Sequence, residues 1–287
     1  MSYIKRSTIQ LLRFPFSFFL LPVFLYALAF STSINLYKAL LIGFILHVLV
    51  YPSSNGYNSF MDRDIASIGG VKQPMLPEKQ LLYVTILFDL VALLLSAMIS
   101  MSYFILIGIY ITCSRLYSYR GVRLKKYPII GYIIVVANQG CLIFYAVYSE
   151  LNLESRSLPN SLMLINAGLL IGAFYPLTQI YQHQQDKYDD VKTISMALGI
   201  RGTFIFSAIL NILSFIIYYF ILIEFKINYF IFSLFYLPSV FYFVKWAYAC
   251  FQNPSAANFD KTMRMNYWAM TSSIASFLFI LLIKHFG

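Results

Sequence analysis

Long runs of apolar residues recur along this chain of 287 residues, and many of them can cross a bilayer core of about 30 Å. We identify nine such segments, at residues 9–30, 36–54, 81–98, 101–114, 128–149, 161–181, 203–223, 228–248 and 267–284. Only 11% of the residues are charged and 60% are hydrophobic, which leaves too little charge to cover a soluble surface. The sequence therefore predicts an all-α, polytopic integral membrane protein.

The connections between these segments predict a single unit. No Gly/Ser-rich or Pro-rich linker divides the chain, and no stretch outside the apolar segments is long enough to fold independently. We therefore expect one transmembrane domain over residues 1–287.

The distribution of basic residues predicts the orientation of the chain. Nine spans put the termini on opposite sides, and all but four of the 21 Lys and Arg residues fall on the N-terminal side. The four exceptions are Lys38, Arg156, Lys226 and Lys284. By the positive-inside rule the N-terminus is cytoplasmic, and we expect a bacterial inner membrane as the setting. The net charge of +10 then reflects topology and attraction to anionic lipid or substrate, and it does not indicate a nucleic-acid partner.

Acidic residues are scarce, and nearly half of them lie in two short segments. The chain has eleven Asp and Glu residues, five of which are Asp62, Asp64, Asp186, Asp189 and Asp190. Asn58 precedes Asp62 by four residues, which places both on one helical face. Gln182 precedes Asp186 by the same interval. Carboxylates beside apolar helices are costly unless they bind something, so both segments are candidate functional sites.

These carboxylates suit a hard cation. Clustered Asp without His or Cys at ligand spacing favours Mg²⁺, which proteins usually hold with a few carboxylates and substrate phosphate oxygens. Basic residues follow each acidic segment, and the loop after the fourth span adds further donors on the same side. The residues expected to bind phosphate oxygens are Lys72, Arg123, Lys125, Lys192 and Tyr119. Acids for a metal and bases for phosphate together indicate a diphosphate substrate.

At these residues the chain resembles the UbiA superfamily of intramembrane prenyltransferases. Members carry an NxxxDxxxD motif after the second span and a DxxxD-type motif after the sixth, within nine helices. Asn58 and Asp62 match the first motif, whereas Ala66 occupies its last Asp position. Asp186 matches the later Asp of the second motif, whereas Gln182 occupies the earlier position.

The resemblance implies a ring of transmembrane helices around a central cavity that opens to the cytoplasmic side. It also implies Mg²⁺-dependent loss of diphosphate from an allylic prenyl diphosphate, followed by attack of an aromatic or other lipophilic acceptor. Asn58, Asp62 and Asp186 are then the expected catalytic residues. The expected metal ligands are Asp62, Asp64, Asp186 and Asp190, since Asp64 lies two residues after Asp62 and Asp190 lies one helical turn after Asp186. We expect no obligate protein partner.

Two other functions remain open from the sequence. A membrane terpene cyclase on the same scaffold would use the same acids, Mg²⁺ and bases, so the motifs do not separate it from a transferase. The departures from the family motifs at Ala66 and Gln182 are a reason to retain this alternative. A transporter is disfavoured because its carboxylates are expected near the bilayer midplane rather than at loop junctions on one side.

A polar stripe along the second span predicts part of the cavity wall. His47, Tyr51 and Asn55 recur at helical intervals before the first acidic segment, and Gln182 is added from the second segment. Such a stripe lines a substrate cavity or forms a hydrogen-bonded seam between helices. Asp89, in the middle of the third span, is expected to pair with a polar group on another helix.

Overall fold

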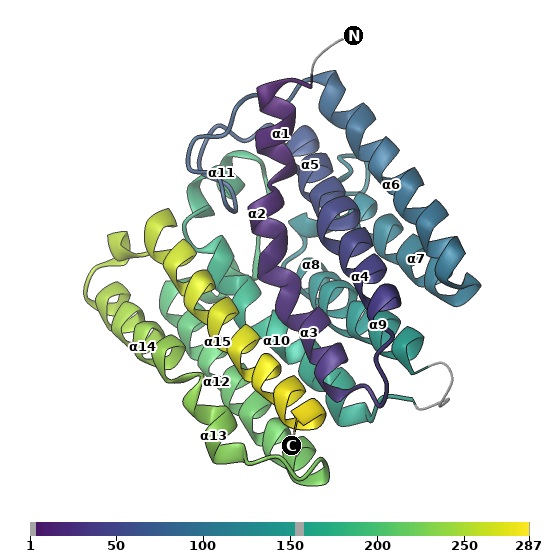
Figure 1. The fold of residues 1–287 in the computed structure, drawn as a ribbon. Helices are drawn as coiled ribbons and strands as arrows, with labels where there is room; N and C mark the ends of the chain where they lie inside the picture. Colours follow the sequence, from purple (N-terminus) through teal and green to yellow (C-terminus); the bar gives the residue numbers. More distant parts are fainter. Residues whose placement is uncertain (1–3, 153–157, 287) are drawn as a thin grey trace.

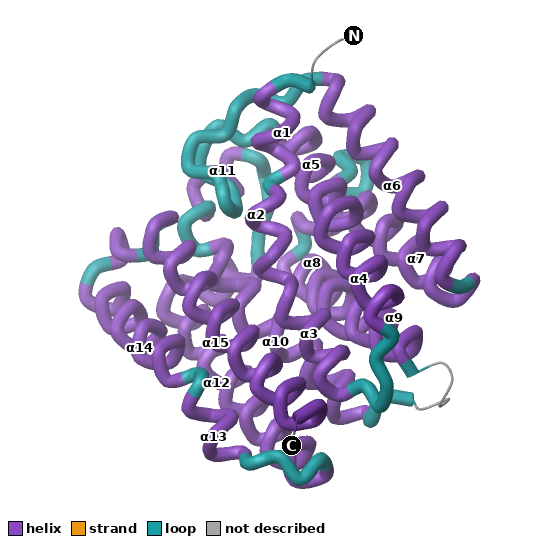
Figure 2. The backbone as a smooth tube through the Cα atoms, viewed as in Figure 1, coloured by secondary structure: helices purple, strands orange, loops and turns teal. Residues whose placement is uncertain are grey.

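The computed structural model describes residues 4–152 and 158–286, and all regular elements within these ranges are helical. Figure 2 shows helices joined by loops, and the described chain contains no strand beyond one isolated bridge between Ile68 and Val71. The predicted all-α class is confirmed.

The helices follow the apolar segments closely. They are α1 (Arg6–Leu12), α2 (Phe14–Ser17), α3 (Leu21–Phe30), α4 (Leu36–Phe44), α5 (Tyr51–Asp62), α6 (Lys79–Ile99), α7 (Met101–Ser118), α8 (Pro128–Val135), α9 (Ile143–Leu151), α10 (Ser161–Gln179), α11 (His183–Tyr188), α12 (Ile194–Glu224), α13 (Tyr229–Leu234), α14 (Leu237–Gln252) and α15 (Phe259–Phe286). Short 3₁₀ turns are η1 (Phe18–Leu20), η3 (Leu124–Lys126) and η5 (Pro254–Ala256). Two π-helical segments are η2 (Ile45–Val50) and η4 (Val136–Leu142).

Seven helical segments of the described chain are long and apolar enough to cross a membrane. They are 6–30, 36–62, 79–99, 128–151, 161–179, 194–224 and 259–284. The other two predicted spans fall on α7, whose last turn is made polar by Arg115 and Ser118, and on α13 and α14, which are interrupted before Pro238. Helix length and composition therefore support seven of the nine predicted spans, and the other two remain a prediction.

The first and last spans lie side by side (Figure 1), and their contact closes the bundle. The buried ring of Tyr26 on α3 stacks on Phe277 of α15, with ring centroids 5.3 Å apart. Lys284 near the end of α15 donates to the carbonyl oxygens of Ala29 and Ser31 at 3.0 and 2.6 Å. The space that these helices enclose with α5, α7, α8 and α10 holds the cavity described below.

The expected partner of Asp89 lies on a neighbouring helix. Arg115 of α7 donates from Nε to Asp89 Oδ2 at 2.9 Å, and the Ser53 hydroxyl donates to Asp89 Oδ1 at 2.6 Å. The Arg115 guanidinium also lies 4.0 Å from the centre of the Tyr57 ring. The prediction that Asp89 pairs across helices is confirmed, and the pair ties α5, α6 and α7 together.

Candidate active site

A cavity of about 280 Å³ lies between the helices at the end of the bundle that carries both acidic segments. Its lining comes from the first span, α5, α7, α8, η4, α10 and α15, and from the loops around the acidic residues. The charged lining residues are Arg13, Asp62, Asp64, Lys125 and Asp186. We call the part of the cavity that these five residues line the mouth of the cavity.

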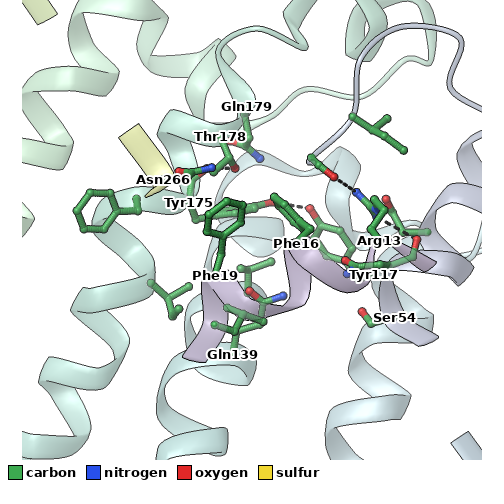
Figure 3. Close-up of a pocket in the computed structure, with 18 of the residues that line it drawn as sticks. Arg13, Phe16, Phe19, Ser54, Tyr117, Gln139, Tyr175, Thr178, Gln179 and Asn266 are labelled. Carbon is green, nitrogen blue, oxygen red and sulfur yellow. Dashed lines mark hydrogen bonds between the residues drawn. The ribbon is translucent and has the colours of Figure 1, made fainter. Parts of the chain in front are cut away.

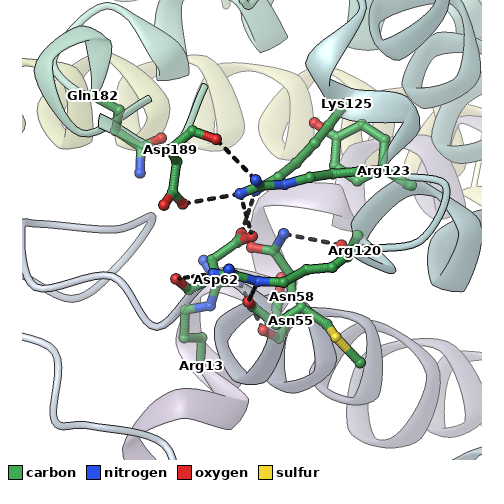
Figure 4. Close-up of polar contacts among 12 residues, drawn as sticks. Arg13, Asn55, Asn58, Asp62, Arg120, Arg123, Lys125, Gln182 and Asp189 are labelled. Carbon is green, nitrogen blue, oxygen red and sulfur yellow. Dashed lines mark hydrogen bonds and ion pairs between the residues drawn. The ribbon is translucent and has the colours of Figure 1, made fainter. Parts of the chain in front are cut away.

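Asp62 is the last residue of α5 and is buried, with 5% of its surface exposed. Its carboxylate forms an ion pair with Lys125, and Arg123 lies 3.6 Å from its Oδ1 (Figure 4). Arg120 donates to the carbonyl oxygens of Met61 and Asp62 at 2.6 and 3.2 Å, which satisfies the end of the helix. Asp62 Oδ1 accepts no hydrogen bond from the described residues. One oxygen of this buried carboxylate therefore remains able to bind a further ligand.

Asp64 and Asp186 both line the mouth. Asp64 comes from the loop after α5, and Asp186 comes from α11. Neither has a Lys or Arg within ion-pair distance among the described residues. Burial, together with the neighbouring carboxylate of Asp62, raises the pKa of Asp64 to about 6. Burial raises the pKa of Asp186 to about 7, and Lys125 opposes this shift. Both groups therefore bind a proton or a cation readily near neutral pH.

Asp189 and Asp190 end up in different surroundings. Arg123 donates to the carbonyl oxygen of Asp189 at 2.8 Å and to its Oδ2 at 3.0 Å. Asp190 is exposed, has a left-handed φ of 53° and does not line the cavity. The structure therefore brings Asp62, Asp64 and Asp186 to the mouth and leaves Asp190 outside it.

The predicted phosphate-binding residues separate in the same way. Lys125 lines the cavity. Arg123 does not line it and instead lies between Asp62 and Asp189. The other three, Lys72, Tyr119 and Lys192, are exposed and do not line the cavity. Lys72 instead pairs with Asp260 at 2.8 Å, which links the loop after α5 to the start of α15.

The amides of the two motifs lie at the cavity. Asn58 donates to the Ser118 hydroxyl at 3.0 Å, and Gln182 donates to the carbonyl oxygen of Ser67 at 3.3 Å. Asn55 also lines the cavity. His47 and Tyr51 do not, because both side chains are buried against neighbouring rings. The predicted stripe is therefore split between the cavity and a seam of packed helices.

Arg13 is a mouth residue that was not among the predicted site residues. It separates α1 from α2 with a left-handed φ of 52°, and its guanidinium points into the mouth (Figures 3 and 4). It donates to the carbonyl oxygens of Asn55 and Gly69 at 2.9 and 3.4 Å. The helix-breaking Arg-Phe-Pro sequence at 13–15 was the available signal.

The mouth has the donor chemistry for a hard cation. Three carboxylates approach it, one of which has an oxygen free of hydrogen bonds. However, no group of three Asp, Glu, His or Cys side chains in the described chain is close enough to form a complete metal site. The residues therefore fit a cation that takes its remaining ligands from a substrate or from water, as Mg²⁺ commonly does.

The UbiA prenyltransferase family model matches residues 18–270. The chain is a member of this family. No curated protein sequence matches it. A UbiA homologue from Archaeoglobus fulgidus bound to GPP and Mg²⁺ is similar in fold, with 18% identity, a TM-score of 0.65, and coverage of 95% of this chain and 99% of that one.

Two further solved structures resemble this UbiA family member. The apo UbiA homologue from Aeropyrum pernix K1 has 11% identity and a TM-score of 0.68, and the match covers 98% of this chain and 100% of that one. A digeranylgeranylglyceryl phosphate synthase structure has 18% identity and a TM-score of 0.60, with coverage of 95% and 96%. At these identities the structures establish the fold. The expected resemblance to the UbiA superfamily is confirmed.

Proposed function

We propose that this UbiA family member is a Mg²⁺-dependent intramembrane prenyltransferase that transfers the prenyl group of an allylic diphosphate to a lipophilic acceptor. The observation that carries the proposal is the mouth itself, where Asp62, Asp64 and Asp186 meet Lys125 and Arg13 above a cavity whose lining includes many apolar side chains. An anionic head group bound with a cation suits such a mouth, and a hydrocarbon chain suits such a lining. The A. fulgidus homologue bound to GPP and Mg²⁺ supports the same assignment.

Asp62, Asp64 and Asp186 are the residues proposed to hold Mg²⁺. When bound, the ion neutralises negative charge on the diphosphate oxygens. Lys125 binds and orients the diphosphate, and Arg123 supports it by holding Asp62 and Asp189 in place. Asn58 is held by Ser118 with its side chain at the cavity, where it helps to position the head group.

The proposed transfer exchanges one bond for another. The bond between C1 of the prenyl group and the diphosphate oxygen breaks, and its electron pair leaves with the diphosphate. The acceptor supplies the electron pair for a new bond to C1, and the proton that it loses is taken up by the diphosphate. Aromatic side chains at the cavity, among them Phe16, Phe19 and Phe174, exclude water and face the electron-deficient carbon chain.

The polar lining favours transfer over cyclisation. Gln139 and Asn266 present amide groups to the cavity beyond the mouth. A hydrocarbon chain that cyclises has no group to pair with these amides, whereas an oxygen-bearing acceptor does. The cyclase is therefore the second outcome of the test below.

The test is incubation of the purified chain in lipid vesicles with Mg²⁺ and the C10, C15 and C20 prenyl diphosphates, with and without aromatic acceptors. We expect diphosphate release that depends on Mg²⁺ and on an acceptor, together with a prenylated product in the organic extract. A cyclic hydrocarbon formed without acceptor would instead identify a cyclase. Consumption of none of the three diphosphates would contradict both functions.

We also propose that the mouth faces the cytoplasm, that the C-terminus lies on the opposite side, and that residues 1–287 form one domain in a bacterial inner membrane. The positive-inside distribution of Lys and Arg supports this orientation. The test is labelling of single cysteines placed at exposed Lys187 and at Lys226 by a membrane-impermeant maleimide in intact cells. We expect labelling at 226 only, and labelling at 187 alone would reverse the orientation.

A further inference from the structure

The wall of the cavity divides into two faces of different chemistry. The side formed by the first span, α10 and α15 is mainly apolar, and Phe19, Leu170 and Met270 are examples. The side formed by α5, α7 and η4 is mainly polar, and five of its residues lie away from the ends of α5 and α7 that reach the mouth. We call these residues, Ser54, Tyr110, Ser114, Asn138 and Gln139, the polar wall.

The polar wall lies well below the mouth. Ser54 precedes Asp62 on α5 by eight residues, which corresponds to a depth of about 12 Å. Tyr110 precedes the end of α7 by the same number of residues. In Figure 3, Ser54 and Gln139 lie lower in the view than Arg13 and Gln179. The prenyl diphosphate head group at the mouth therefore does not account for these polar residues.

Most of the polar wall is held in place by its own hydrogen bonds. The hydroxyls of Ser54 and Ser114 are 2.5 Å apart, and Asn138 donates to the carbonyl oxygen of Tyr110 at 3.1 Å. The Gln139 amide interacts with the Tyr110 hydroxyl and lines the cavity, and because an amide carries two N–H donors and an acceptor oxygen, one contact does not use all of its hydrogen-bonding groups. Gln139 is therefore the group of this wall that is best placed to bind a ligand, supported by residues that are already fixed.

The two adjacent amides of the polar wall lie on a π-helical segment. Asn138 and Gln139 of η4 both reach the lining of the cavity. Gly140 anchors this segment, because a Cβ there would lie 2.6 Å from the carbonyl oxygen of Ala167 on α10. π turns are often found at functional sites.

The polar wall contains no charge, and Lys125 at the mouth is the residue proposed to bind the diphosphate. The charged residues among the described lining all belong to the mouth. Lys125 pairs with Asp62, and Arg13 donates to the carbonyl oxygens of Asn55 and Gly69. Arg115 lies behind Ser54 and Tyr110 but is paired with Asp89. A carboxylate or phosphate on a second substrate would therefore find no unpaired cation at the polar wall among the described residues, and its burial would be costly.

We infer that the polar wall is the acceptor subsite, and that it binds a neutral hydroxyl or carbonyl group, with Gln139 as its main hydrogen-bonding residue. The acceptor is then a neutral phenol, quinol or related lipid rather than an aromatic carboxylate or a lipid phosphate. This inference rests on the proposed transferase function. It extends that function by naming the chemical class of the second substrate.

The test compares related acceptors with and without a carboxylate charge. The purified chain in vesicles with Mg²⁺ and each prenyl diphosphate is given 4-hydroxybenzoate or its methyl ester, and 1,4-dihydroxy-2-naphthoate or 1,4-dihydroxynaphthalene. We expect kcat/KM to be at least about tenfold higher for the neutral member of each pair, because a desolvated charge without a partner is rejected. Equal or greater transfer to the carboxylates would overturn the inference while leaving the proposed function intact.

Variants of Gln139 test whether this residue is responsible for the preference for neutral acceptors. Gln139→Leu should raise the KM for the neutral acceptor about tenfold and leave the KM for the prenyl diphosphate unchanged. Gln139→Lys should shift the preference towards the carboxylate member of each pair. Gln252→Leu, the same change at an exposed amide away from the cavity, is the matched control and should change neither constant.

The remaining outcomes are also decisive. An unchanged acceptor KM in folded Gln139→Leu would overturn the inference, and so would transfer to no member of either pair. A cyclic hydrocarbon formed without acceptor would overturn the proposed transferase as well, and this outcome separates the failure of the function from the failure of the subsite.

Discussion

The two acidic segments look like matched half-sites in sequence, yet the structure treats them differently. Asp62 ends a long helix, is buried, and is neutralised by Lys125 and Arg123. Asp186 lies on the six-residue helix α11, has no ion-pair partner among the described residues, and has a pKa raised to about 7 by burial. One carboxylate is therefore balanced by the protein, and the other by a proton or a bound cation. Equal spacing produced unequal sites.

Loss of activity is the largest effect that can test this comparison. If both segments hold Mg²⁺, Asp62→Asn should lower kcat/KM by about a thousandfold, because it removes a ligand and leaves Lys125 without its partner. Asp186→Asn should cost about a hundredfold. Mg²⁺-dependent diphosphate release measures both, and Asp190→Asn is the control that should remain within about twofold of wild type. Near-normal turnover by Asp62→Asn would contradict the metal assignment.

Stability should change in opposite directions for the same two variants. Asp62→Asn breaks a buried ion pair and should lower the free energy of unfolding by about 3–5 kcal/mol. Asp186→Asn should instead raise the thermal midpoint at pH 8, where the desolvated carboxylate is ionised. A folded-state pKa of about 7, above the ordinary value of 3.8, means that this cost builds up as the pH rises from about 4 to about 7, so the gain should be full at pH 8, smaller at pH 6 and absent near pH 4. Thermal unfolding in detergent without metal checks both, and a destabilised Asp186→Asn at pH 8 would remove the distinction.

The basic residues give a smaller effect that sharpens the comparison. Lys125 contacts the first carboxylate at the cavity, whereas Lys72 pairs with Asp260 on the exposed surface. Lys125→Ala should therefore weaken the binding of inorganic diphosphate in the presence of Mg²⁺ by about tenfold or more. Lys72→Ala should bind it as the wild type does, because exposed ion pairs contribute little. Equal losses would indicate a general charge effect at the mouth.

The smallest effect is a pH dependence of metal binding. The raised pKa values of Asp64, about 6, and Asp186, about 7, mean that protons compete with Mg²⁺ as the pH falls from 8 to 6. The Mg²⁺ concentration for half-maximal activity should therefore rise several-fold over this range. Asp186→Asn should flatten the dependence near pH 7. An equally steep profile in this variant would place the titrating group elsewhere.

Spacing and composition predicted the helical class, the family resemblance and the convergence of both acidic segments on one cavity. They did not predict which side chains of each loop face inwards. The stripe at i, i+4 assumed a regular α-helix, but the π-helical segment η2 changes the turn, and His47 and Tyr51 pack against rings instead. Asp190 was predicted to bind the metal from its position one turn after Asp186, yet it is exposed and has a left-handed φ. Such local backbone choices depend on tertiary contacts that no periodic pattern records.

The contact between the first and last spans also has a consequence for biosynthesis. Tyr26 stacks on Phe277, and Lys284 caps the carbonyl oxygens at the end of α3, so the ring of helices closes only when the end of the chain is in place. A chain that leaves the ribosome N-terminus first must therefore hold its first span without its final neighbour until synthesis is nearly complete. During this time the aromatic residues of the first span lack their contacts with α15, and Arg13 belongs to an incomplete bundle. The site is thus assembled last, although its first residues are made first.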